Sequence, residues 1–207
     1  RGSQLDAPTC LVVVGAESSK AAPVADAIAR LGRMFRSAVT FQVHGRADHA
    51  AIRSGVNAAR RARADVVLAV GGGTTLDVGK AVSALAEHDD AEDVEGFQTG
   101  CHRVNPARAL PWIAVPTTSG TGAESTNNAV VELGDEKRSI RGIPPPKLIM
   151  ADPALTDSLP LAPTAIAAVD ALSQALEVLT SAEASPVVQS LSIEASVNLI
   201  RGIGSLI

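Results

Sequence analysis

The stretch Asp65–Lys80, which reads DVVLAVGGGTTLDVGK, decides the fold. Its apolar, β-branched run over Asp65–Val70 is typical of a strand buried on both faces of a parallel sheet. Three glycines, Gly71–Gly73, end that strand, and Thr75–Ala86 has the pattern of a helix. A strand, a short turn and a helix are the repeating unit of α/β proteins with parallel sheets.

The glycine turn also suggests a chemistry. Glycines let a phosphate approach the backbone amides closely, and the N-terminus of a helix offers free N–H groups and a partial positive charge. Thr74 and Thr75 can cap the helix or donate hydroxyl groups to phosphate oxygens. The turn therefore indicates a phosphate-binding site, with an ordinary strand-to-helix turn as the alternative. It is neither GxGxxG nor a Walker loop, so we do not interpret Lys80 as a P-loop lysine.

Strands and helices alternate on both sides of this unit, so we predict a parallel sheet with helices on both faces, Rossmann-like in class. The expected strands are Cys10–Gly15, Ala38–Val43, Pro111–Pro116 and the short Ala129–Leu133 and Leu148–Met150, and the expected helices are Ala21–Met34 and Asp48–Arg63. Residues 87–110 are expected to be a long polar connection.

The pattern changes near Pro153, beyond which Thr164–Thr180 and Pro186–Ile203 are predicted to be helices. We place a domain boundary there, with residues 1–150 as the α/β domain and 151–207 as the start of an all-helical second domain. The apolar ending over Ile203–Ile207 predicts a face that needs a partner.

Composition excludes several classes of protein. The 207 residues are 46% apolar and carry a net charge of −4, which does not favour nucleic acid as a partner. Arg46, Arg53, Arg60, Arg61 and Arg63 form a basic stretch that we interpret as a solvated helix face. No apolar run approaches the roughly 20 residues of a membrane helix, and the two cysteines lack metal or redox spacing. We therefore expect a soluble cytoplasmic protein without a membrane partner.

Five motifs in order then resemble those of the iron-type alcohol dehydrogenases of the dehydroquinate-synthase-like superfamily. The family patterns GGGSxxDxxK, PTTxGTGSE, a lysine before an apolar position, DPxLTxxLP and DALxHAxE correspond here to Gly71–Lys80, Pro116–Glu124, Lys137 with Ile140, Asp152–Pro160 and Asp170–Glu177. The resemblance spans nearly the whole chain. It implies an NAD(P)-dependent oxidoreductase that interconverts an alcohol and an aldehyde or ketone, acting as a homodimer on a small-molecule substrate.

The resemblance also implies roles for individual residues. Gly72, Gly73 and Thr74 would hold the pyrophosphate, and Asp77 would line the nicotinamide side of the cleft. The second loop would bind the cofactor through Thr117, Thr118 and Thr121, and Lys137 would reach the ribose or phosphate region. The first domain, residues 1–150, would then bind the dinucleotide, and residues 151–207 would begin the metal and substrate domain.

The chain departs from the family at the metal. Asp170 matches a metal-ligating aspartate, but Gln174 stands one helical turn later where the family has histidine. An amide oxygen is a poor ligand for iron or zinc. A site made of Asp170 and two downstream histidines stays open, with a hydrogen-bonded carboxylate as the alternative. His44, His49, His88 and His102 match no ligand position, and we expect them at the surface.

Two further expectations follow from the resemblance. The family often has aspartate at the end of its first strand, whereas this chain has Gly15 followed by Ala16-Glu17-Ser18-Ser19-Lys20, which favours NADP(H), although Glu17 could still accept the ribose hydroxyls. The family's remaining metal histidines lie further downstream, so we expect a fragment or a natural truncation with no turnover by these residues alone. The alternatives are a cofactor-binding protein without catalysis and a lyase of the dehydroquinate-synthase type.

Overall fold

The computed structural model describes residues 7–204. Its main sheet has five parallel strands in the order β2-β1-β3-β4-β7. The strands are β1 (Thr9–Gly15), β2 (Ser37–Val43), β3 (Val66–Gly71), β4 (Trp112–Pro116) and β7 (Leu148–Ile149). Since β1 lies between β2 and β3, the chain leaves β1 in one direction and returns on its other side. The predicted parallel α/β sheet is confirmed.

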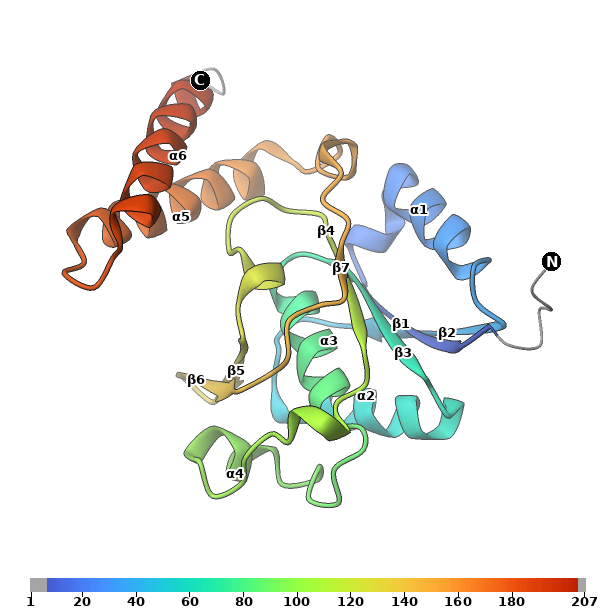
Figure 1. The fold of residues 1–207 in the computed structure, drawn as a ribbon. Coiled ribbons are helices and arrows are strands. Elements are labelled where there is room, and N and C mark those ends of the chain that lie inside the picture. The colour runs from blue at the N-terminus through green and yellow to red at the C-terminus, as the bar shows by residue number, and fades with distance from the viewer. Residues whose placement is uncertain (1–6, 205–207) are drawn as a thin grey trace.

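Side chains of β1 alternate between two cores. Leu11 and Val13 pack in the larger cluster, on the side of α2 (His49–Ala62) and α3 (Gly73–Leu85). Val12 and Val14 pack in the smaller cluster with Val24 of α1 (Ala22–Gly32). Figure 1 shows α1 on one face of the sheet and α2 and α3 on the other. Burial on both faces is the reason that the central strands are continuously apolar.

A small antiparallel sheet lies over α3 on the side away from the main sheet (Figure 1). It consists of β5 (Asn128–Leu133) and β6 (Glu136–Arg141), joined through Gly134, which has a φ of +60°. Strand β6 was not predicted because it reads EKRSIR, and only Ile140 of its side chains is buried. The hairpin matters because it places β5 beside the N-terminal half of α3.

Residues 87–110 are more ordered than the predicted polar connection. They contain α4 (Val94–Thr99) and a 3-10 turn, η3 (Pro106–Arg108). The α4 helix is six residues long and buries Val94 and Phe97, so its apolar signal is too short to show a helical period. Three other 3-10 turns are η2 (Ser18–Lys20), η4 (Ala123–Ser125) and η5 (Pro153–Leu155).

The last part of the chain is a pair of helices, α5 (Leu161–Thr180) and α6 (Pro186–Gly204), which projects from the sheet (Figure 1). Helix α5 begins three residues before the predicted Thr164, because Pro163 is tolerated in a first turn. Just before α5, Leu155 is buried in the smaller core cluster. Many apolar side chains of α5 and α6 are exposed, including Ile166 and Val187. Leu206 and Ile207, part of the predicted apolar ending, lie outside the described residues.

Within residues 7–204, none of the helices combines the length and apolar character needed to span a bilayer.

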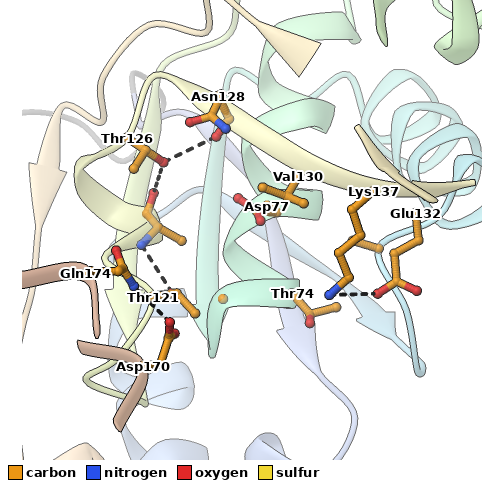
Figure 2. A pocket seen from close by; sticks show the side chains of 13 residues that line it. Thr74, Asp77, Thr121, Thr126, Asn128, Val130, Glu132, Lys137, Asp170 and Gln174 are labelled. Carbon is orange, nitrogen blue, oxygen red and sulfur yellow. Dashed lines mark hydrogen bonds and ion pairs between the residues drawn. The ribbon is translucent and has the colours of Figure 1, made fainter. Parts of the chain in front are cut away.

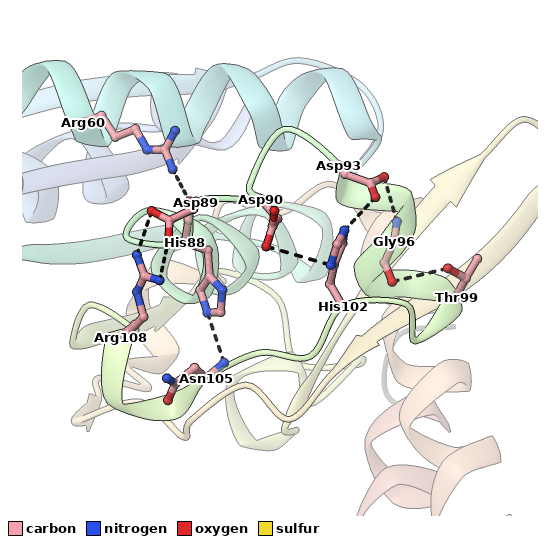
Figure 3. Close-up of polar contacts among 10 residues, drawn as sticks. All are labelled: Arg60, His88, Asp89, Asp90, Asp93, Gly96, Thr99, His102, Asn105 and Arg108. Atoms are coloured by element: carbon pink, nitrogen blue, oxygen red, sulfur yellow. Dashed lines mark hydrogen bonds and ion pairs between the residues drawn. The ribbon is translucent and has the colours of Figure 1, made fainter.

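One histidine contradicts the expectation that all four lie at the surface. His88 is buried, and its Nε2 accepts a hydrogen bond of 3.0 Å from the backbone N–H of Asn105 (Figure 3). Its ring meets the edge of Phe97, with 5.3 Å between ring centroids. Burial lowers the pKa of His88 below its ordinary 6.5, and the positive charge of Arg108 lowers it further. The prediction that His88 lies at the surface was wrong because residues 87–110 fold around it, with Phe97 and Asn105 in contact with its ring.

This burial makes the stability of the domain depend on pH. His88 has a lower pKa in the folded than in the unfolded state, so the unfolded state binds the proton more readily as pH falls below about 6.5. We expect the free energy of unfolding to decrease between pH 7.5 and pH 5, and His88→Gln to flatten that decrease. Urea denaturation followed by circular dichroism measures both. His44→Gln, at an exposed position, is the control, and an equal effect of both variants would contradict the assignment.

Candidate functional site

A cavity of about 310 Å³ opens at the N-terminus of α3 (Figure 2). Its walls come from α3, the loop after β4, the β5–β6 hairpin and α5. Most of the residues singled out from the sequence line it, although they come from four separate segments. They are Gly73, Thr74, Asp77, Thr121, Lys137, Asp170 and Gln174.

A second cavity of about 330 Å³ adjoins the first at Thr74, which lines both. It lies at the carboxyl ends of β1 and β2, and its lining includes Gly15, Glu17, Ser18 and His44. In open parallel sheets, ligands bind outside the carboxyl ends of the strands at the point where the strand order reverses. That point lies between β1 and β3, beside the start of α3.

The glycine bend meets a packing requirement in addition to the predicted approach of a phosphate. None of Gly71–Gly73 has a positive φ, and Gly72 has φ −78° and ψ −176°, which any residue can adopt. The glycines allow close packing. A Cβ atom on Gly73 would lie 2.8 Å from the side chain of Thr121, and one on Gly71 would lie 2.7 Å from Thr75. The bend therefore leaves room for the side chain of Thr75 in the first turn of α3 and lets the loop after β4 approach the start of that helix.

The threonines of the bend do not cap α3. The N-cap is Gly72, which has no side chain to accept from the first turn, and no acidic residue stands in that turn. Thr75 is buried, whereas Thr74 is exposed toward both cavities. The N–H groups of the first turn thus lack a side-chain acceptor from the N-cap, which suits an anionic ligand.

Three of the predicted cofactor residues do not line either cavity. Thr117 is buried, and its N–H donates to the carbonyl oxygen of Gly71 at 3.0 Å, which fastens the end of β4 to the end of β3. Gly72 lies against Thr118, whose side chain would meet an added Cβ at 3.2 Å. Thr117 and Thr118 thus support the bend, and Gly72 is the N-cap residue next to Gly73, which lines the first cavity.

Asp77 and Lys80 form an ion pair of 2.9 Å at the back of the first cavity. Asp77 is 13% exposed and lines the cavity, while Lys80 is fully buried and does not reach it. Burial raises the pKa of Asp77 above its ordinary 3.8, and the charge of Lys80, its hydrogen bond and the backbone of Val130 oppose that rise. The sequence analysis assigned no role to Lys80, although a spacing of three residues puts Asp77 and Lys80 on one face of α3.

Lys137 reaches the cavity mouth from β6 (Figure 2). Its Nζ lies 3.8 Å from a carboxylate oxygen of Glu132, and Arg46 meets the same carboxylate at 3.2 Å. The Lys137 side chain is mostly exposed, so this pairing holds it only weakly. Lys137 can therefore reorient toward an anionic ligand.

On the opposite wall, Asp170 and Gln174 come from one face of α5 (Figure 2). The Gln174 amide nitrogen donates to Asp170 Oδ1 at 3.1 Å and to the carbonyl oxygen of Gly120 at 3.2 Å. Gly120 also lies close to α5, since a Cβ there would be 2.8 Å from the carbonyl oxygen of Ala167. Gln174 thus fastens α5 to the loop after β4.

These contacts bear on the predicted metal. Both neighbours of the Gln174 amide are acceptors, so its nitrogen must face them, and its oxygen is turned away from Asp170. Among residues 7–204, His, Cys, Asp and Glu side chains form no group of three that could hold a metal ion. The described residues therefore do not fit a metal site at Asp170.

The sequence of this chain is similar to those of known proteins. Residues 3–158 match the family model of iron-containing alcohol dehydrogenases. The chain is 38% identical over 138 residues to long-chain-alcohol dehydrogenase 1 of Geobacillus thermodenitrificans, covering 66% of this chain and 35% of that protein. It is 32% identical over 162 residues to 4-hydroxybutyrate dehydrogenase of Cupriavidus necator, covering 76% and 41%. The chain thus spans well under half the length of these relatives.

Solved structures resemble this one over nearly all of its length. The NADH-dependent butanol dehydrogenase A of Thermotoga maritima aligns with a TM-score of 0.86 and 26% identity, covering 98% of this chain and 51% of that one. An iron-containing alcohol dehydrogenase from Thermotoga maritima aligns with a TM-score of 0.84 and 30% identity, covering 97% of this chain and 56% of that one. The family match over residues 3–158, together with the fold, shows that this chain belongs to the iron-containing alcohol dehydrogenase family.

Proposed function

We propose that this chain binds NAD(P)(H) as the nucleotide-binding part of an oxidoreductase that interconverts a small alcohol and an aldehyde or ketone. The observation that carries the proposal is the pair of cavities that adjoin at Thr74, at the start of α3. A dinucleotide has two nucleoside halves joined by a pyrophosphate, so it matches two cavities joined at a helix N-terminus.

The proposed arrangement assigns each end of the cofactor. The pyrophosphate lies against the amides of Gly72, Gly73 and Thr74. The adenosine half occupies the cavity bounded by Gly15–Ser18, and the nicotinamide half occupies the cavity lined by Asp77.

The four other residues expected to bind the cofactor have distinct places. Thr121 and Lys137 contact the cofactor from the loop and the hairpin, because both line the cavity proposed for the nicotinamide half, the nicotinamide cavity. Thr117 and Thr118 support the bend rather than touching the ligand. When bound, the cofactor would supply the hydride chemistry, and the residues named here would fix its distance and orientation.

The reaction class is supported by the relatives of this chain, which include a long-chain-alcohol dehydrogenase, a lactaldehyde reductase and a 1,3-propanediol dehydrogenase. These names differ in substrate, so the proposal extends only to a small alcohol or carbonyl compound. Homodimer formation stays a prediction.

The proposal contains no metal step. Iron or zinc at Asp170 was predicted from the resemblance, but the described donor set is one carboxylate with an amide nitrogen directed at it. The Gln174 amide nitrogen directed at Asp170 favours, as a second candidate, a protein that binds the cofactor without catalysis. The two candidates differ in turnover of an aldehyde when cofactor binding is intact.

NADP(H) is the proposed cofactor in preference to NAD(H). Glu17 lines the adenosine cavity, but its carboxylate is paired with Lys20 Nζ at 2.7 Å. Lys20 competes with the two ribose hydroxyls for the Glu17 carboxylate, and it brings a cation next to a residue that lines the adenosine cavity. The pair is exposed, so a bound phosphate can compete for Lys20.

Fluorescence titration of the 207-residue chain with NADPH and with NADH, in the presence of EDTA, tests the proposal. We expect saturable binding of both, with NADPH tighter by about tenfold, or about 1.4 kcal/mol. Tighter binding of NADH would contradict the cofactor preference alone. If neither NADPH nor NADH bound, the proposed function would be contradicted.

A further inference from the structure

Lys80 is an unusual residue for the interior of an α/β layer. It is fully buried and, after Trp112, is one of the largest side chains with almost no exposure. A buried ammonium group is retained only when its charge is paired and its three N–H donors find acceptors. The partners of Lys80 therefore indicate what the residue holds in place.

Its ammonium group meets acceptors from two walls of the nicotinamide cavity. It lies 2.9 Å from Asp77 Oδ1 on α3, and it donates to Thr126 Oγ1 at 2.8 Å and to the carbonyl oxygen of Asn128 at the start of β5. Asp77, Thr126 and Asn128 all line the cavity, whereas Lys80 does not. A single buried cation thus joins the α3 wall to the hairpin wall from behind.

We propose that Lys80 is a positioning residue for the nicotinamide end of the cofactor, acting through Asp77. The lysine holds the Asp77 carboxylate in one orientation and keeps it ionised, so that Asp77 can accept hydrogen bonds from an uncharged N–H donor such as the carboxamide of a nicotinamide ring. This inference rests on the proposed function, because it assumes that a nicotinamide cofactor occupies the cavity.

The charge balance around Asp77 explains why the lysine is needed. Burial favours the protonated carboxyl group, and the Lys80 charge is the first effect opposing it. The other charged groups around the same cavity are Glu132 and Lys137 on the hairpin and Asp170 on α5. Lys137 is mostly exposed and paired with Glu132. Lys80 is the buried cation among them.

The test compares two ligands that differ only at the nicotinamide end. NADPH carries the ring, whereas 2′-phospho-ADP-ribose keeps the phosphates and the adenosine but lacks it. In the 207-residue chain, Lys80→Met should weaken NADPH binding about tenfold and leave the affinity for 2′-phospho-ADP-ribose unchanged. In the variant, part of the NADPH affinity should return as pH rises from 6 to 9, because Asp77 then ionises without its partner.

A matched control separates positioning from a general loss of stability. Ser83 is fully buried on the same helix and donates to the carbonyl oxygen of Leu110 at 2.7 Å, away from the cavity. Ser83→Ala should leave the ratio of the two affinities as in the parent chain. Should Lys80→Met fold poorly, Asp77→Asn combined with Lys80→Met removes both charges, and it should lose the same NADPH advantage without the pH dependence.

The possible results distinguish the role of Lys80 from cofactor binding itself. If Lys80→Met lost affinity equally for NADPH and 2′-phospho-ADP-ribose, or for neither, the proposed role of Lys80 would be wrong while cofactor binding by the parent chain would stand. Failure of the parent chain to bind either ligand would remove the proposed function and this inference with it.

Discussion

Gly73→Val is expected to weaken NADPH binding by about 100-fold, which corresponds to about 2.7 kcal/mol, with little change in the stability of the fold. Even a single Cβ atom at this position would lie 2.8 Å from the Thr121 side chain, and the glycine lines the cavity at the start of α3. An isopropyl group would occupy the space where the pyrophosphate approaches the helix amides. Stability should change little because Thr121 is exposed and can move aside.

Isothermal titration with NADPH and urea denaturation together check this prediction. Gly202→Val on α6 is the control, because an added Cβ there meets no atom within 4 Å. Its affinity for NADPH should equal that of the parent chain. Unchanged affinity in Gly73→Val would mean that the cofactor does not approach this bend.

Trp112→Ala is expected to lower the free energy of unfolding by about 3–5 kcal/mol. Trp112 begins β4, is 1% exposed in the larger core cluster, and pairs in register with Val67 of β3. Its Nε1 donates to the carbonyl oxygen of Pro144 at 3.0 Å, which ties β4 to the segment before β7. The alanine variant leaves a cavity and removes the hydrogen-bond donor of the Pro144 carbonyl oxygen.

Urea denaturation monitored by far-UV circular dichroism measures this effect, since Trp112 is the only tryptophan and its fluorescence is lost in the variant. Trp112→Phe keeps most of the volume but not the hydrogen bond, and it should cost clearly less. It should also keep the parent affinity for NADPH, because Trp112 lies outside both cofactor cavities. A loss below about 1 kcal/mol in Trp112→Ala would show that the surroundings close over the gap.

Most of the main sheet could be predicted because its signal is local. The runs that became β1 and β3 are buried on both faces, so nearly every residue in them is apolar and the strands stand out in a single window. The same reasoning failed for β6 and α4. In β6 one buried side chain holds the strand, and in α4 the helix is shorter than two turns.

The candidate site was only partly predictable. The motifs indicated which residues would gather, and Gly73, Asp77, Thr121 and Asp170 do line one cavity. They did not indicate that Thr117 would be buried behind the wall, because its place depends on a hydrogen bond to Gly71 across two neighbouring strands. The assignment of these residues to a cofactor stays a prediction.

The amino-acid sequence by itself determined the class of the fold and the family. Strand hydrophobicity and the order of the motifs are properties of short segments, so they can be recognised without knowing what packs against them. Tertiary structure alone decided the surroundings of the polar groups. Lys80 is buried between α3 and a hairpin that begins 48 residues later, and Gln174 reaches Gly120 across 54 residues. The charge state and orientation of such groups depend on burial and on partners distant in the chain, which no local pattern records.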